Sequence, residues 1–274
     1  MRTKLLKGFG ILSLLALLIG CEITVNNPPV SEPEPDEEPT VEANITIETP
    51  SENETVSNPI HLTGEARVFE SQLSWRLKDV NGNILMEGHV MSQAADSGQF
   101  GDYEVWIPVP AVTDPHLTVE AFQYSAMDGS VIDLVSVPVL LDRIEKTDVQ
   151  LYFHNDTLDP EISCTEVFPV PRSMAVSESA VRVAMLALLQ GPSESEKESG
   201  YSTTIPFMTE LKDINLKSDG TLIVDLKGSI SYTPMAGSCL VGSIRAEIEQ
   251  TAMQFATVKS VEILIDGEEN RLEP

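Results

Sequence analysis

Positive charge, histidine and aromatic side chains are all scarce in this sequence. Its 274 residues include 17 lysines and arginines against 43 aspartates and glutamates, which gives a formal net charge of −26. A chain this acidic repels the phosphates of nucleic acids and the anionic headgroups of lipids. The charge therefore argues against nucleic acid as a partner, and against docking on a membrane by charge alone.

Motifs of catalysis and of cofactor binding are also missing. The four histidines are scattered and none has the spacing of a zinc motif. There is no G-x-S-x-G turn, no phosphate-binding glycine loop and no dinucleotide-binding motif. Asp79, Asn81 and Asn83 alternate like the start of a calcium loop, but the glycine and glutamate that would complete such a loop are absent from their positions. We predict no catalytic residue, no cofactor and no metal site.

No apolar run is long enough to cross a membrane. Twelve uncharged residues, Phe9 to Gly20, follow a basic start at Arg2, Lys4 and Lys7, whereas a membrane-spanning helix takes roughly 20 residues. This length and these flanks are typical of a secretory signal. The run ends in Leu18-Ile19-Gly20-Cys21, which resembles the bacterial lipobox.

The lipobox resemblance implies that residues 1–20 are a signal peptide, removed before Cys21, and that the Cys21 thiol carries lipid. Acyl chains contribute about 0.8 kcal/mol per buried CH₂ and hold a soluble protein stably at a membrane surface. The alternatives are an ordinary signal peptide and an uncleaved anchor. We expect a protein that is lipid-anchored through Cys21 on the extracytoplasmic face of a bacterial membrane.

Residues 21–43 have the composition of a tether. After Cys21 they contain five prolines, seven acidic residues and no basic residue. Such a segment cannot bury enough apolar surface to fold and stays extended. We predict a disordered, acidic, proline-rich spacer.

Residues 44–142 alternate between apolar and polar side chains, which is typical of strands with one buried face. The apolar sets include Ile60, Leu62 and Ala66; Leu73, Trp75 and Leu77; Tyr103, Val105 and Ile107; and Leu117, Val119 and Ala121. The dipeptides Asn81-Gly82 and Asp128-Gly129 favour tight hairpins between strands. About seven strands without a helical stretch predict an all-β sandwich.

This region also resembles a known domain. The run from Asn58 to Glu70 is similar to the opening of the immunoglobulin-like domain of bacterial spore germination. That family has corresponding features at the positions of three further segments, the Asp79–Gly82 hairpin, the Asp128–Ser130 turn and Val137-Pro138-Val139. The resemblance implies an immunoglobulin-like, non-catalytic extracellular module.

In residues 147–270 the apolar period changes to that of helices. Ser177 is a suitable N-cap for a helix with an apolar stripe that ends at Gly191-Pro192. A second helix is expected from about Ser238 to Phe255. Strands are expected around 149–153, 211–216, 222–226 and 261–265, and another is expected to open at Cys164. This order predicts a small α+β domain with two helices on one face of a sheet.

The second region resembles the GerM domain of sporulation and spore germination. The similar stretches are Leu151–Phe153, Ala187–Pro192, Ile205-Pro206, Asp219-Gly220 with Val224–Leu226, Gly237-Ser238, and Thr251 with Gln254-Phe255. Ala256 departs from the family, which usually has proline there. The two domains behind a lipobox resemble GerM-type envelope lipoproteins. In spore formers, this resemblance implies a part in assembling a channel between two membranes.

Cys164 and Cys239 remain once Cys21 is set aside, an even number for an oxidising compartment. We expect them to form a disulfide, because the family-like arrangement brings the end of the first loop beside the start of the second helix. The alternatives are two buried thiols, or a reactive Cys239 near a helix start, with a histidine such as His154 as its base. Arg172 and Arg245 are expected in structural ion pairs rather than as ligand clamps.

These features together favour a non-enzymatic, membrane-anchored envelope lipoprotein that binds or scaffolds other envelope components. Its expected partners are the membrane, through Cys21, and an envelope protein or the cell wall. The alternative is a peptidoglycan-binding envelope enzyme, or a regulator of one. An enzyme would show a deep cleft with converging polar groups, whereas a scaffold would show flat faces or exposed sheet edges.

Overall fold

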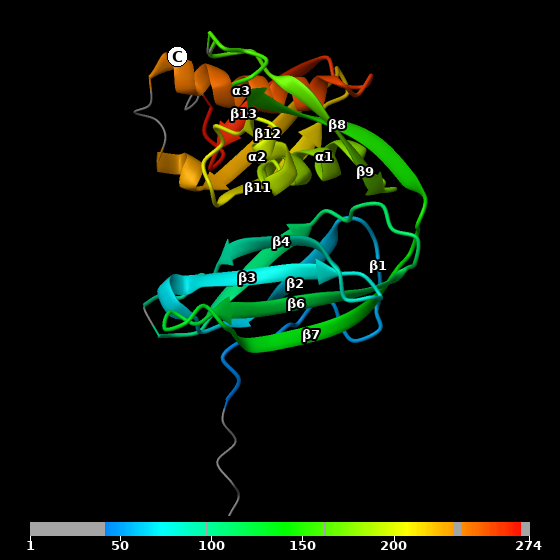
Figure 1. Ribbon diagram of the computed structural model, residues 1–274, viewed down its shortest axis with the longest axis vertical. Coiled ribbons are helices and arrows are strands. Elements are labelled where there is room, and N and C mark those ends of the chain that lie inside the picture. The colour runs from blue at the N-terminus through cyan, green and yellow to red at the C-terminus, as the bar shows by residue number, and fades with distance from the viewer. Residues whose placement is uncertain (1–41, 97, 162, 233–236, 270–274) are drawn as a thin grey trace, which may run out of the picture. The chain divides into compact units, whose positions relative to one another are not determined.

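The computed structural model describes residues 42–96, 98–161, 163–232 and 237–269 (Figure 1). All of these belong to a single contact unit. Cys21, the predicted signal peptide and nearly all of the predicted tether lie outside the described residues. Within the described part, no helix is long and apolar enough to cross a membrane.

The first folded part is a β-sandwich, as the sequence predicts. Its strands are β1 (Thr55–Val56), β2 (Ile60–Ala66), β3 (Gln72–Lys78), β4 (Ile84–Met91), β5 (Gly101–Ile107), β6 (His116–Tyr124) and β7 (Val131–Leu141). One sheet has five strands in the order β1-β7-β6-β3-β4, and the other pairs β2 with β5. In Figure 1, β3, β6 and β7 lie side by side in the larger sheet.

The predicted apolar faces form the sandwich core. Ile60 and Leu62 of the small sheet and Leu73, Trp75 and Leu77 of the large sheet are fully buried and belong to one cluster. Burying a large apolar side chain contributes about 1.5–3 kcal/mol each. The alternation of side chains along the strands therefore fixes which face of each sheet is covered.

The Asp79–Gly82 segment is a hairpin turn, as predicted. The Asp79 carboxylate accepts hydrogen bonds from the backbone N–H groups of Asn81 and Asn83 at 2.9 and 2.8 Å. Gly82 has a φ of +81°, a value that glycine adopts without strain. The oxygens of Asp79 thus serve the turn between β3 and β4.

The second folded part is an α+β domain. Its elements are β8 (Lys146–Asn155), β9 (Phe168–Ala175), α1 (Ala180–Leu189), α2 (Glu194–Glu198), β10 (Tyr201–Ser202), β11 (Thr209–Leu216), β12 (Thr221–Gly228), α3 (Ser238–Met253) and β13 (Ser260–Ile265). The strands form two three-stranded sheets, β10-β8-β9 and β11-β12-β13. Helices α1 and α3 both pack on β8, and they also contact β11 and β13 respectively. The predicted fold class is confirmed.

Three local details differ from the sequence predictions. Helix α1 is capped by Ser179, whose hydroxyl accepts the N–H of Arg182, because the Ser177 hydroxyl instead donates to the carbonyl of Asn58 at 2.6 Å. Cys164 lies in a turn before β9 and opens no strand. The short elements α2 and β10 were not predicted, since five polar residues carry no apolar stripe.

Cys164 and Cys239 form the expected disulfide. Their Cα atoms are 5.0 Å apart, across 75 positions of sequence. The Ser243 hydroxyl also donates to the carbonyl of Cys164 at 2.6 Å. The bond fastens the loop before β9 to the first turn of α3, so the two free-thiol alternatives are wrong.

Thr251 of α3 and Gln254, which follows the helix, complete the hydrogen bonding of strand β8. The Thr251 hydroxyl accepts the N–H of Tyr152 at 3.1 Å. The Gln254 amide accepts the N–H of Gln150 at 2.8 Å and donates to its carbonyl at 2.7 Å. Buried backbone groups must be paired, so these two side chains replace a neighbouring strand where β8 meets the helix.

Candidate functional site

The junction between the two folded parts is made by backbone pairing around Asn58. Ala111 donates its N–H to the carbonyl of Ser173, and Ala175 donates to the carbonyl of Val109, both at 2.9 Å. The buried Asn58 amide donates to the carbonyl of Ala175 at 2.6 Å, and its oxygen accepts the N–H of Val109 at 2.9 Å. These bonds continue the end of β9 into the sandwich.

Side chains also cross this junction. Ala175 belongs to the sandwich core, and Trp106 packs against the core of the second part. A Cβ at Gly88 would lie 2.4 Å from the Trp75 ring and 2.7 Å from the Gln190 side chain. Strand β4 can therefore approach the end of α1 only because residue 88 has no side chain.

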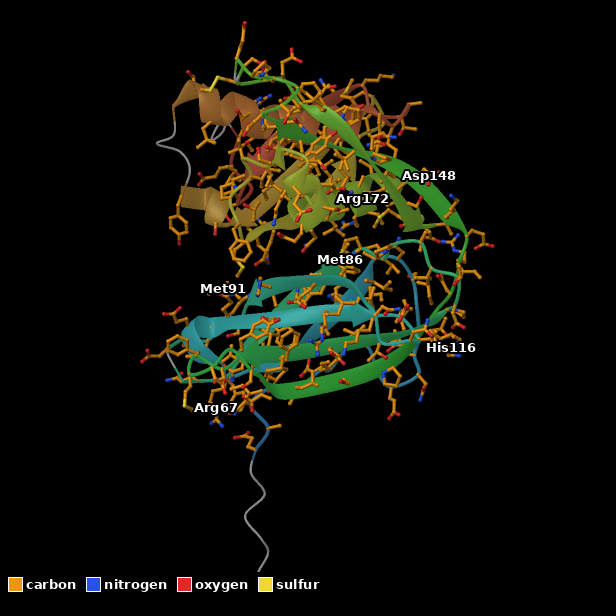
Figure 2. The ribbon with its side chains drawn as sticks, viewed as in Figure 1. Arg67, Met86, Met91, His116, Asp148 and Arg172 are labelled. Atoms are coloured by element: carbon orange, nitrogen blue, oxygen red, sulfur yellow. A yellow bond between two sulfur atoms is a disulfide. The ribbon has the colours of Figure 1, made fainter. Side chains whose placement is uncertain are left out.

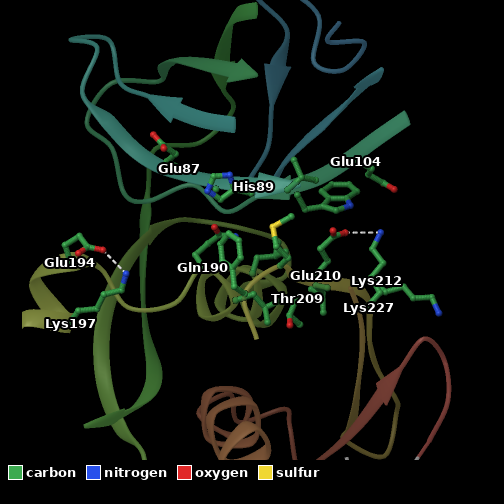
Figure 3. Close-up of a pocket in the computed structure, with 18 residues that line it drawn as sticks. Glu87, His89, Glu104, Gln190, Glu194, Lys197, Thr209, Glu210, Lys212 and Lys227 are labelled. Carbon is green, nitrogen blue, oxygen red and sulfur yellow. Dashed lines mark hydrogen bonds and ion pairs between the residues drawn. The ribbon is translucent and has the colours of Figure 1, made fainter. Parts of the chain in front are cut away.

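A pocket of about 380 Å³ opens between the two parts (Figure 3). Its walls come from β4, β5, α1, α2, β11 and β12. They include Glu87, Gly88, His89, Glu104, Val105, Trp106, Leu186, Leu189, Gln190, Glu194, Lys197, Phe207, Met208, Thr209, Glu210, Leu211, Lys212 and Lys227. The lining thus combines apolar and aromatic side chains with both signs of charge.

Two aromatic side chains stand out in the lining. Phe207 is 68% exposed and meets the His89 ring edge-on at 5.4 Å. Trp106 is stacked on the His61 ring at 4.1 Å between centroids, nearly parallel at 9°. The guanidinium of Arg182 lies 5.8 Å from the Trp106 ring. The exposed phenyl ring of Phe207 is a surface that apolar or cationic groups bind, whereas the indole of Trp106 already contacts His61 and Arg182.

The three lysines of the pocket are each held by a carboxylate of this chain. The pairs are Lys197–Glu194 at 2.7 Å, Lys227–Glu210 at 3.1 Å and Lys212–Asp225 at 3.1 Å. Figure 3 draws the Glu194–Lys197 pair at the rim. The charges on the α+β side of the pocket therefore largely neutralise one another.

The two carboxylates on the sandwich side have no lysine or arginine partner among the described residues. Glu104 lies 2.8 Å from the ring nitrogen of His61. Glu87 accepts a hydrogen bond from the Tyr124 hydroxyl at 2.8 Å. This wall of the pocket is consequently negative.

The hydroxyl and imidazole groups of the pocket lining are both engaged within the chain. Thr209 is its one hydroxyl among the lining residues, and that hydroxyl donates to the carbonyl of Pro206 at 2.7 Å. Burial lowers the pKa of His89, against a smaller opposing effect of Glu87. The His89 ring is thus neutral near pH 7, and its Nδ1 lies 3.1 Å from the Ser74 hydroxyl.

Family models match both folded parts. Residues 44–130 match the family described as immunoglobulin-like domain of bacterial spore germination. Residues 150–271 match the family described as sporulation and spore germination. Each folded part is thus similar to a germination domain. The two resemblances read from the sequence are thereby confirmed, and we refer below to the immunoglobulin-like domain and the GerM domain.

Solved structures give weaker similarities. The tandem GerMN domains of the sporulation protein GerM from Bacillus subtilis align over 46% of this chain and 41% of that chain, at 18% identity and a TM-score of 0.32. The first GerMN domain of the same protein aligns over 45% and 85%, at 17% identity and a TM-score of 0.32. CopC from Methylosinus trichosporium OB3b aligns over 36% and 91%, at 14% identity and a TM-score of 0.25. No curated protein matches the chain.

The residues singled out in the sequence lie away from the pocket lining. Cys164 and Cys239 form the disulfide at the start of α3. Arg172 of β9, labelled in Figure 2, forms a bidentate ion pair with Glu196. One of its guanidinium nitrogens donates to Oε1 of Glu196 and the other to Oε2, the latter at 2.6 Å. Arg245 pairs with Glu249 at 2.6 Å within α3. Both arginines therefore form the structural ion pairs that were expected.

Sequence reasoning missed the pocket residues, although two of them carry a signal. Trp106 occupies a position on β5 between the apolar Val105 and Ile107, where the alternation calls for a polar side chain. Phe207 follows Ile205-Pro206, a stretch quoted for the GerM resemblance, and precedes β11. A large aromatic residue at a solvent-facing position is the feature that points to a binding surface.

A second buried polar cluster lies inside the GerM domain. Glu247 of α3 is 0% exposed and accepts hydrogen bonds from the Thr203 hydroxyl at 2.5 Å and from the N–H and hydroxyl of Thr204, both at 2.7 Å. The Nε2 atom of His154 lies 3.4 Å away. Burial raises the pKa of the Glu247 carboxyl, against these hydrogen bonds. The cluster anchors the chain after β10 to α3.

Among the described residues, no group of acidic, histidine and cysteine side chains is arranged to hold a metal ion.

Proposed function

We propose that this protein is a non-enzymatic envelope module that binds or scaffolds other envelope proteins, and that the pocket between its two domains is the contact site. The observation that carries the proposal is the pocket lining. Exposed Phe207 and the Trp106 ring lie among charges that are mostly paired, and the one lining hydroxyl is bonded to backbone. Both domains match models of sporulation and germination families, which supports a role in envelope assembly of that type.

The location of the protein is part of the proposal. The lipobox ending at Cys21 would place lipid on the first residue of the mature chain, on the extracytoplasmic face of a bacterial membrane. The acidic, proline-rich residues 22–43 would hold the two domains away from the bilayer. The Cys164–Cys239 disulfide is in keeping with an oxidising compartment outside the cytoplasm.

A pull-down from intact cells after chemical crosslinking tests the contact site. The variant Phe207→Asp places a charge in the pocket, and Phe69→Asp is its matched control. Phe69 is 65% exposed, close to the 68% of Phe207, but does not line the pocket. We expect the same envelope proteins with the unaltered chain and with Phe69→Asp, and their loss with Phe207→Asp.

Two results would contradict this proposal. One is that Phe207→Asp captures the same proteins as the unaltered chain. The other is that the purified protein cleaves peptidoglycan, which would favour the enzyme alternative.

The anchor has its own test. Because Cys21 is the residue that would carry lipid, Cys21→Ser should block lipid labelling and release the protein from membranes. The released fraction is measured after a carbonate wash, with the unaltered protein as control. A substituted protein that still sediments with membranes would show that the anchor lies elsewhere.

A further inference from the structure

We infer that the pocket binds a lysine or arginine side chain carried on an extended segment of a partner protein. This inference rests on the proposed function, because it specifies what the proposed contact site takes. Three features of the described residues support it: the two carboxylates without a lysine or arginine partner, the aromatic rings and the sheet edges that border the pocket.

The charge of the sandwich wall selects for a cation. Glu87 and Glu104 pair with no lysine or arginine among the described residues, whereas Lys197, Lys212 and Lys227 each already have a carboxylate. An anionic ligand would have to break one of those pairs, whereas a cation would gain the carboxylate of Glu87 or of Glu104 in competition only with the Tyr124 hydroxyl or the His61 ring. The net charge of −26 adds a field that draws cations toward the protein.

The aromatic rings suit the shape of a basic side chain. A lysine or arginine has a charged tip on an apolar stem, and the tip binds favourably over an aromatic face. Phe207 offers such a face, Trp106 adds apolar surface although His61 is stacked on it, and Val105 and Leu189 of the lining can cover the stem. A volume of about 380 Å³ accommodates the side chains of one segment and not a folded domain.

The backbone around the pocket favours an extended segment over a free amine. Strand β4 is the last strand of the five-stranded sheet, and β11 is the last strand of its own sheet. Both contribute to the lining, through Glu87–His89 and Thr209–Lys212. An edge strand presents unpaired N–H and carbonyl groups that an extended peptide can meet, with its side chains entering adjacent pockets.

Tryptophan fluorescence provides a direct readout of binding. The chain has two tryptophans, of which Trp75 is 0% exposed in the sandwich core and Trp106 lines the pocket. A change in emission on adding a ligand therefore reports on Trp106. The variant Trp106→Phe, which should lose the change, verifies this assignment.

The test titrates the full chain with short peptides of alternating valine and lysine. The same peptides with acetylated lysine, or with glutamate in place of lysine, are the controls. We expect the lysine peptide to bind, with an affinity that falls as salt is raised, and the two control peptides not to bind. Glu104→Gln should weaken binding about threefold, the effect of losing one exposed ion pair. Glu52→Gln, which changes an exposed carboxylate outside the pocket, should leave it unchanged.

Several outcomes would overturn the inference. Acetylated peptide that binds as tightly as the lysine peptide would show that charge is irrelevant. Spermidine that binds more tightly than the peptide would mean that the site takes a free amine. If none of these ligands binds while Phe207→Asp still loses its partners in cells, then the cationic ligand is wrong and the proposed function stands. If Phe207→Asp keeps its partners, the proposed function itself is wrong.

Discussion

The side-chain amide of Asn58 donates a hydrogen bond to the carbonyl oxygen of Ala175 at 2.6 Å, across 117 positions of sequence. Asn58 precedes the first long strand of the immunoglobulin-like domain, and Ala175 ends the second strand of the GerM domain. The same amide oxygen accepts the N–H of Val109. One buried side chain thus satisfies backbone groups from both domains at the place where they join.

Asn58→Ala should destabilise the protein. The substitution leaves the N–H of Val109 and the carbonyl of Ala175 without that partner, and a buried polar group that loses its hydrogen bond costs about 1–3 kcal/mol. We expect the free energy of unfolding in urea to fall by about this amount. Asn215→Ala is the control, because Asn215 is exposed on β11, and it should change stability by about 0.5 kcal/mol or less. Equal effects of the two substitutions would mean that the Asn58 bonds contribute little.

Removing the disulfide should destabilise the GerM domain. The Cys164–Cys239 bond closes a loop of 75 positions, and a disulfide typically contributes about 2–4 kcal/mol by restricting the unfolded chain. The double variant Cys164→Ser/Cys239→Ser should therefore unfold at lower urea concentration, and so should the reduced unaltered protein. Reductant should not affect the double variant. An unfolding midpoint that is the same with and without the bond would contradict this expectation.

The buried carboxyl of Glu247 should make stability depend on pH. Burial raises its pKa above the ordinary value of 4.5. As pH rises, the carboxyl therefore loses its proton in the unfolded state at a lower pH than in the folded state. The stability that the neutral carboxyl contributes to the folded state is fully present below about pH 4.5. It is lost as pH rises through the higher folded-state pKa.

The unaltered protein should accordingly lose stability relative to Glu247→Gln between about pH 4.5 and pH 7. Urea unfolding of both proteins across this range measures the difference. If the unaltered protein instead gains stability over the variant, the hydrogen bonds from Thr203 and Thr204 outweigh burial and the pKa is lowered.

The sequence was sufficient for the elements whose pattern is local. Alternating side chains such as Leu73, Trp75 and Leu77 locate strands, and Asn81-Gly82 locates a hairpin, because each depends on neighbours a few residues away. The disulfide was accessible from the number of cysteines and the family-like order of elements. The start of α1 was misplaced by two residues, because the Ser177 hydroxyl bonds to Asn58 and not to the helix.

The pocket could not be predicted in the same way. Its lining comes from six elements of two domains and is assembled by the junction at Asn58, Val109 and Ala175, which no local pattern encodes. The close approach of Gly88 to Gln190 likewise depends on the pairing of distant segments. Trp106 alone carries a local signal, because it stands where the alternation of β5 calls for a polar side chain, and the sequence analysis did not use that signal.

Site-specific photocrosslinking in intact cells tests the central claim, that the pocket is the surface through which this protein meets its partners. A photoreactive amino acid would replace Phe207 in one sample and Phe69 in another, two positions of almost equal exposure at 68% and 65%. We predict discrete crosslinked products with envelope proteins from position 207 and few or none from position 69. Equal yields at the two positions, or products from position 69 alone, would contradict the claim.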